Sequence, residues 1–259
     1  MEIFMIEKLK KNSFLFEELV KRDFKKKYKR TALGMLWSML SPLMSLLVMA
    51  LVFTQFFGRN MEHYVIYIFC GNLIFTYFRE ATVGGMQALT SNAGIITKVN
   101  VPKYLFLFSK NISALINFGL SLIIFFVFVG VDGISFKWKF ILLLFPIICL
   151  VIFNVGMGLV LSAMFVIFKD VQYLYDIFTT LLMYVSAIFY TVTSYPQNLQ
   201  GLFYLNPIYV FITYFREVVI NNQIPSIGIH LLCLIYCVVI FTIGCIIYKK
   251  YNYKFLYYM

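Results

Sequence analysis

Six long apolar segments determine the fold that is open to this chain. Each is long enough to cross about 30 Å of hydrocarbon, which takes roughly 20 helical residues. The segments lie at residues 33–57, 64–87, 112–131, 140–168, 171–192 and 227–248. Hydrophobic residues make up 62% of the chain and charged residues 13%, a balance that water-soluble domains do not show. The sequence therefore predicts an all-α integral membrane protein with six transmembrane helices.

The placement of Lys and Arg predicts the orientation of these spans. A strongly basic stretch at residues 21–30 runs directly into the first apolar segment. With the amino terminus inside, most of the 22 Lys and Arg residues fall in inner segments. Because such residues are retained on the cytoplasmic side, both termini are expected in the cytoplasm. The net charge of +11 is then a topological signal, and no nucleic-acid partner is expected.

The chain is expected to form a single domain. Residues 1–32 would be a cytoplasmic amphipathic segment, residues 33–248 the membrane domain and residues 249–259 a cytoplasmic tail. Phe16, Val20, Phe24 and Tyr28 recur every four residues, opposite a lysine face. This pattern predicts a helix that lies in the plane of the membrane interface. The first 30 residues lack the pattern of a removable signal peptide.

The last outer connection, residues 193–226, is the exception to the pattern of full spans. Its apolar stretch, residues 199–220, is interrupted by Asn206 and Pro207. The piece that begins at Pro207 would extend only about 21 Å as a helix, which is too short to cross. Re-entrant half-helices that enter the outer leaflet are therefore predicted here.

Three ionisable residues lie within the predicted spans: Arg79, Glu80 and Asp176. Each is costly in hydrocarbon unless it is paired or faces water. Arg79 and Glu80 point about 100° apart on a helix, so they are not expected to pair with each other. They either face a water-filled path or a subunit interface, or reach the interface from a shorter second span. Aromatic residues, 19% of the chain, fit either a sugar conduit or a membrane-interface belt.

The sequence carries no signature of an enzyme. No G-x-x-x-x-G-K-[ST] phosphate loop is present, so any ATP and Mg²⁺ would be bound by another subunit. His63 and His230 are far apart, and Cys233 and Cys237 lack further ligands nearby. We therefore expect no catalytic residue, no metal site and no cofactor in this chain.

Short motifs follow one another in a fixed order along most of the chain. The first group comprises Arg22, Asp23, Phe24, Lys25, Tyr28, Leu33, Gly34, Trp37, Pro42 and Phe53. The second comprises Asn92, Ile95, Ile96, Lys98, Val99, Pro102 and Lys103. The third comprises Lys169, Asp170, Val171, Ser186, Ala187, Ile188, Phe189, Tyr190, Asn206, Pro207 and Arg216. Together they resemble the motifs of the ABC-2 type permeases that export lipid-linked polysaccharides. Lys169 stands where that family often has Arg, and Arg79 with Glu80 has no counterpart in the pattern.

The resemblance implies a half-transporter in the bacterial plasma membrane. Two copies of the chain would form the channel, with two copies of a separate ABC ATPase subunit beneath them. The substrate would be a polyprenyl-diphosphate-linked glycan, such as O-antigen, teichoic acid or a capsule-like polymer. Contacts with the ATPase would map to Arg22, Asp23, Lys26, Tyr28, Asn92, Ile95, Lys98, Val99, Pro102 and Lys103. The conduit or outer gate would map to Phe189, Tyr190, Pro196, Tyr204, Asn206, Pro207, Tyr209 and Arg216.

The basic residues before the first span suggest one more role. Lys25, Lys29 and Arg30, together with Lys26, are expected to attract the negatively charged lipid diphosphate at the inner interface.

Other functions stay open at this point. An ABC-2 permease for a lipid or a drug is one, although such relatives commonly carry a larger insertion than residues 58–63. A membrane transferase acting on polyprenyl lipids is another, but it would need a metal-binding acidic motif that the sequence lacks. A structural membrane subunit would not require the broken outer half-helices.

Overall fold

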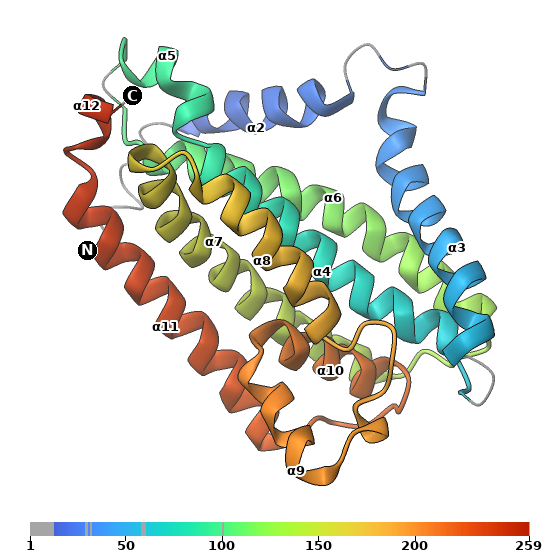
Figure 1. The fold of residues 1–259 in the computed structure, drawn as a ribbon. Helices are drawn as coiled ribbons and strands as arrows, with labels where there is room; N and C mark the ends of the chain where they lie inside the picture. The colour runs from blue at the N-terminus through green and yellow to red at the C-terminus, as the bar shows by residue number, and fades with distance from the viewer. Residues whose placement is uncertain (1–12, 29–30, 32, 58–60, 100, 259) are drawn as a thin grey trace.

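The computed structural model is a bundle of long helices with short helices at its two ends (Figure 1). It describes residues 13–258 except 29–30, 32, 58–60 and 100. The described part of the chain contains helices and turns but no strand. The fold is therefore all-α, as the sequence predicts.

The long helices correspond to the six apolar segments. They are α3 (Trp37–Phe57), α4 (Tyr64–Gln87), α6 (Tyr104–Val131), α7 (Leu144–Ile167), α8 (Val171–Val185) and α11 (Ile227–Tyr251). Among the described residues, four helical segments are long and apolar enough to span a membrane: most of α3, all of α6, α7 with the turn before it, and α11. α4 has the length but carries Arg79 and Glu80, whereas α8 has only 15 residues.

Three of the expected boundaries were wrong. α6 begins at Tyr104, well before residue 112, because the helix continues through the polar Ser109–Lys110 turn that an apolar window excludes. α8 ends at Val185, before residue 192, because Ala187 adopts a φ of 50°. That left-handed conformation cannot continue a right-handed helix. The first span also starts later than expected, at Trp37, after Gly34 with a φ of 53°.

Short helices cover the two ends of the bundle. α2 (Ser13–Tyr28) crosses one end and packs on α6, and α5 (Ala93–Ile96) and α12 (Phe255–Tyr258) lie at the same end (Figure 1). α9 (Gln197–Gln200) and α10 (Pro207–Val219) lie at the opposite end. We call these ends the α2 end and the α10 end.

α2 packs on α6 through a face that differs from its row of apolar residues. Leu19 and Asp23 are buried among its described side chains, whereas Phe16, Val20 and Phe24 are only partly covered. The buried Asp23 carboxylate has a partner on α6, and the partly covered apolar row stays available for the predicted contact with the membrane interface. The side chain of Tyr28 lies outside the described residues.

Glycines allow the central helices to approach closely. A Cβ atom at Gly244 of α11 would lie 2.5 Å from the carbonyl oxygen of Gly156 on α7. A Cβ atom at Gly85 of α4 would lie 2.8 Å from the Cα atom of Gly158. Small residues at helix crossings let backbones pack at van der Waals distance in membrane bundles. These two crossings fix α4 and α11 on opposite sides of α7.

Replacing Gly244 with Val is expected to destabilise the bundle strongly, because the new side chain would meet backbone atoms of α7. Overpacking of this kind costs roughly 3 kcal/mol, which corresponds to a fall in Tm of about 6–12 °C for a chain of this size. Thermal aggregation of the detergent-purified protein measures it. Gly119→Val is the matched control, since nothing lies within 4 Å of a Cβ atom at Gly119. Equal Tm values for the two variants would contradict the close crossing.

Candidate functional site

A polar cluster joins α2 to the turn after α4 and to the start of α6. The carboxylate of Asp23 is almost completely buried, with 3% of its side chain exposed. One oxygen accepts from the guanidinium of Arg22 at 2.8 Å, and the other pairs with Nζ of Lys110 at 3.2 Å. The Ser109 hydroxyl lies 3.5 Å from the same second oxygen. A buried carboxylate with two cationic partners holds α2 in one position on α6.

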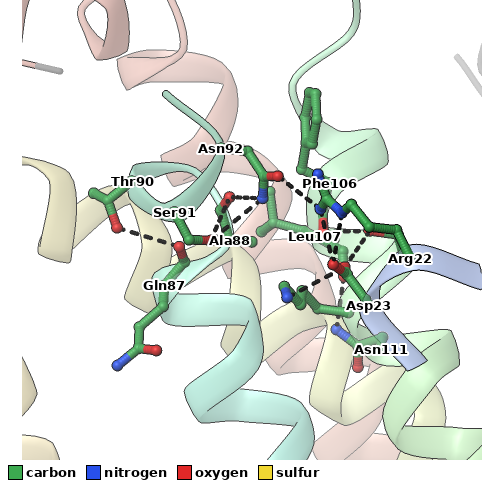
Figure 2. Close-up of polar contacts among 12 residues, drawn as sticks. Arg22, Asp23, Gln87, Ala88, Thr90, Ser91, Asn92, Phe106, Leu107 and Asn111 are labelled. Atoms are coloured by element: carbon green, nitrogen blue, oxygen red, sulfur yellow. Dashed lines mark hydrogen bonds and ion pairs between the residues drawn. The ribbon is translucent and has the colours of Figure 1, made fainter. Parts of the chain in front are cut away.

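Arg22 extends this cluster to the turn that follows α4. Its Nη2 atom donates to Oδ1 of Asn92 at 2.7 Å, while the Asn92 amide donates to the carbonyl of Ala88 at 2.7 Å. Figure 2 shows Arg22 between Asp23 and Asn92, with Asn92 turned back onto α4. Arg22, Asp23 and Asn92, predicted as part of one coupling surface, are thus brought into direct contact. We call Arg22, Asp23, Asn92, Ser109 and Lys110 the α2 cluster.

The predicted inner-loop residues divide into exposed and bound groups. Lys98 and Val99 are exposed, and Ile95 is half-buried on α5. Lys103 donates to the carbonyl of Asn252 at 2.6 Å and lies over the ring of Phe255. Burial lowers the pKa of Lys103. Lys103 therefore attaches the loop to the carboxyl-terminal segment. Lys98 and Val99 form the exposed surface of the loop, and Pro102, which precedes Lys103, is partly covered.

Some predicted residues of the α2 end can be placed only in part. Lys25 is exposed on α2. Lys26 and Tyr28 lie within α2, but their side chains are outside the described residues, and Lys29 and Arg30 are outside them altogether.

At the α10 end, Asn206 stands where two helical pieces meet. Its Oδ1 atom accepts from the backbone N–H groups of Ile208 and Tyr209, which caps α10 directly before Pro207. Its amide donates to the hydroxyl of Ser186 at 2.9 Å. The Asn-Pro pair thus both starts α10 and attaches it to the end of α8.

Arg216 of α10 is buried rather than open, with 7% of the residue exposed. Its guanidinium donates at 3.0–3.3 Å to the carbonyl oxygens of Tyr67, Ala187 and Ile188. Its Cζ atom lies 3.3 Å from the centroid of the Tyr67 ring. Ala187 and Ile188 follow the end of α8, whereas Tyr67 belongs to the first turn of α4. Arg216 therefore holds the turn after α8 against α4.

Two tyrosines of α4 secure the same turn. Tyr64 donates to the carbonyl of Phe189, and Tyr67 donates to that of Tyr190, each at 2.7 Å. We call residues 186–190 the α8 turn.

The other predicted outer residues form an aromatic surface. The rings of Tyr190, Tyr195, Phe203, Tyr204 and Tyr209 make a chain of contacts with centroids 5.4–6.4 Å apart. Phe189 and Tyr209 are buried in the single chain, Tyr190 and Tyr204 are half-buried, and Pro196 is exposed. Of the predicted set, Pro196, Tyr190 and Tyr204 present surface, whereas Asn206 and Arg216 position the backbone.

The ionisable residues of α4 have different partners. Arg79 pairs with Asp176 of α8 at 3.7 Å, and about half of each side chain is exposed. Glu80 accepts from the amide of Asn117 on α6 at 2.5 Å. The two neighbouring side chains thus lie on different faces of α4 and do not pair with each other, as helix geometry predicts.

Sequence reasoning missed three members of this arrangement: Ser109, Lys110 and Asn252. Lys110 is one of the basic residues that the sequence assigns to the inner side, yet it supplies the second cation to Asp23. The predicted span begins only at residue 112, so the sequence did not indicate that Lys110 lies on a long helix, α6. Asn252 acts through its backbone carbonyl, which leaves no trace in the sequence.

The arrangement is that of a multi-pass membrane protein whose polar contacts gather at the two ends of the bundle. The ABC-2 type transporter family matches residues 15–220, and the chain belongs to that family.

Three relatives illustrate the range of similar proteins. An O-antigen export system permease protein RfbA of Myxococcus xanthus is 28% identical over 82% of each chain. An O-antigen export system permease protein RfbA of Klebsiella pneumoniae is 24% identical over 96% of this chain and 97% of its own. A capsule polysaccharide export inner-membrane protein CtrC of Neisseria meningitidis is 23% identical over 77% of this chain and 75% of its own.

Proposed function

We propose that this chain is the permease subunit of an ATP-driven exporter that moves a polyprenyl-diphosphate-linked polysaccharide out of the bacterial cytoplasm. Its relatives are named for export of O-antigen and of capsule polysaccharide, which favours a glycan over a drug or a simple lipid. A separate ABC ATPase binds ATP and Mg²⁺, and the transported glycan carries the negative charge of its diphosphate.

The α2 cluster is the observation that carries this proposal. A permease driven by a separate ATPase needs a rigid connection between the surface that the ATPase touches and the helices that move. Arg22 and Asp23 link α2, the turn at Asn92 and α6 in one network. The exposed Lys98 and Val99 follow directly after α5, where an ATPase surface can reach them. Force applied at α5 would thus be passed to α2, α4 and α6 together.

The membrane arrangement in this proposal has six crossings with both termini in the cytoplasm. α4 completes the set because its Arg79–Asp176 pair faces the water-filled conduit instead of lipid. α8 crosses with the help of the α8 turn, and α9 with α10 re-enters the outer leaflet. The α2 end then lies inside, where Lys25, Lys29 and Arg30 attract the lipid diphosphate.

Two copies of the chain enclose the conduit in this arrangement. A glycan polymer is too long to be held in a closed pocket, so it requires a continuous path. The aromatic surface of the α10 end, with the hydroxyls of Tyr190 and Tyr204, suits stacking on sugar rings at the outer mouth.

The test is purification of the tagged chain from its host in mild detergent, followed by identification of stoichiometric partners and an ATPase assay. Lys98→Glu is expected to weaken binding of the ATPase subunit to the permease. The ATPase activity that co-purifies with the chain should fall at least about tenfold, since a 1.4 kcal/mol loss of binding free energy already gives that factor. Lys250→Glu is the matched control, being an exposed lysine on α11. A chain that purifies without any nucleotide-binding partner would overturn the proposal.

A further inference from the structure

Two cavities lie beside α4 and α6, and both have polar residues in their linings. The larger, about 370 Å³, lies between α3, α4 and α6. The smaller, about 350 Å³, lies under α2. Glu80 and Asn117 line both, so the two cavities adjoin at this pair. We call the larger cavity the α3–α6 groove.

Polar residues make up most of the residues that line the α3–α6 groove. Its polar members are Thr31, Ser38, Ser41, Ser45, Asn72, Thr76, Glu80, Asn117 and Ser121, and its aromatic members are Trp37, Phe69, Tyr77 and Phe118. Polar side chains at this depth are costly unless they meet water or a polar ligand. Hydroxyl, amide and carboxylate groups beside aromatic rings match a ligand with many hydroxyls and an apolar ring face.

The charge of the groove selects among such ligands. Among the described residues that line the groove, one carries a formal charge, and that residue is Glu80. Its carboxylate is oriented by the Asn117 amide at 2.5 Å. A carboxylate in this position repels phosphate groups and accepts hydrogen bonds from hydroxyls. The groove therefore disfavours an anionic headgroup and favours a neutral one.

The adjoining cavity supplies a second observation. The hydroxyl of Ser113 lines it and is buried, and no hydrogen-bond partner is found for it among the described residues. A buried hydroxyl without a partner costs about 1–3 kcal/mol. A polar ligand or a water that extends from Glu80 toward α2 would satisfy it.

We propose that the α3–α6 groove binds a neutral sugar ring, with the Glu80 carboxylate and the Asn117 amide hydrogen-bonded to ring hydroxyls and an aromatic side chain against the ring face. A cavity of about 370 Å³ lies within the usual range for small-ligand sites, about 300–1,000 Å³. The inference deepens the proposed function, because an exporter of glycans brings such rings to this membrane. The ring can belong to a glycolipid headgroup or to a free glycan segment.

The experiment uses a cysteine reporter in the groove. Ser41→Cys is placed in the full chain, purified with any partner it retains and reconstituted into phosphatidylcholine nanodiscs without ATP. Ser41 lines the groove and is exposed, so a water-soluble maleimide can reach the new thiol. Four native cysteines are buried and Cys245 is partly covered, and the chain without the reporter gives their background. Thr97→Cys, exposed directly after α5 and outside the groove, is the matched control.

A neutral sugar is expected to protect the reporter. Adding 10 mol% glucosyl diacylglycerol should slow labelling of the Ser41→Cys reporter at least fivefold and leave the Thr97→Cys reporter unchanged. Glu80→Gln in the Ser41→Cys chain should reduce the protection to less than twofold. Maltose in solution serves as the second probe: protection by it shows that a free glycan segment enters, and protection by the glycolipid alone assigns the ring to a lipid headgroup.

Three results would overturn the inference: equal protection by diacylglycerol without a sugar, stronger protection by phosphatidylglycerol than by the glucosyl lipid, or no protection by either sugar probe. Each leaves the proposed function standing, since that function fails instead when no ATPase partner accompanies the chain.

Discussion

Replacing Asp23 with Asn is expected to reduce ATP-dependent export at least tenfold while leaving the membrane bundle folded. The substitution keeps the shape of the side chain but removes the charge that holds Arg22 and Lys110. Hydrogen bonds to a charged group contribute about 1.5–3 kcal/mol, and the partly exposed cations place the loss near the lower end. A loss of about 2 kcal/mol changes the ratio of docked to undocked α2 roughly 30-fold.

The direct readout is hydrogen exchange of the α2 amides, because export alone cannot separate docking from other defects. Exchange over residues 13–28 should rise in Asp23→Asn and stay unchanged in Glu18→Gln, whose side chain is an exposed acid on the same helix. In a double-mutant cycle with Lys110→Met, the second substitution should cost less once Asp23 is gone. Additive effects, or slow exchange in Asp23→Asn, would show that α2 is held by its apolar contacts alone.

The sequence predicts the membrane helices because each depends on properties of its own segment, such as apolar length. Apolar length gives α3, α6, α7 and α11, and the Asn206–Pro207 pair places the helical break from which α10 starts. Helix geometry alone separates Arg79 from Glu80. What local properties do not contain is the partner on the next helix. Asp176 of α8 and Asn117 of α6 reach α4 through tertiary packing, of which the close crossing of α4 and α7 at Gly85 and Gly158 is one part.

The contacts of individual site residues could not be predicted, for two physical reasons. Asp23 is predicted to couple the chain to an ATPase, and the structure adds that its carboxylate is buried on α6 against a cation far along the chain, Lys110. Arg216 is predicted at the conduit or outer gate, and the structure adds that its partners there are backbone carbonyls of the α8 turn. Every residue has a backbone carbonyl group, so the residue types in a sequence do not indicate which carbonyl groups will accept a hydrogen bond from a buried side chain.

Arg216→Met is expected to cause the largest loss at the α10 end. The methionine fills much of the same space, but it leaves the carbonyl oxygens of Tyr67, Ala187 and Ile188 without their donors. Hydrogen bonds to a charged group contribute about 1.5–3 kcal/mol each, so losing several of them together is expected to cost roughly 3–5 kcal/mol. The hydroxyls of Tyr64 and Tyr67 still hold the α8 turn, so the bundle should fold while its α10 end loosens. Arg216→Lys should recover part of the loss, since one ammonium group cannot reproduce the fork of a guanidinium.

The measurements are the Tm of the purified protein and ATP-dependent export in cells. Arg216→Met should lower Tm by about 6–20 °C, at 2–4 °C per kcal/mol for a chain of this length, and abolish export. Lys139→Met is the matched control, because Lys139 is also a cation at the α10 end that donates to a backbone carbonyl, that of Asn222 at 2.8 Å, but from a partly exposed position. It should change Tm by less than about 2 °C, since removing an accessible hydrogen bond leaves groups that water can satisfy. A stable Arg216→Met protein that exports normally would mean that the tyrosine hydroxyls alone position the α8 turn, and that the buried guanidinium contributes nothing that export requires.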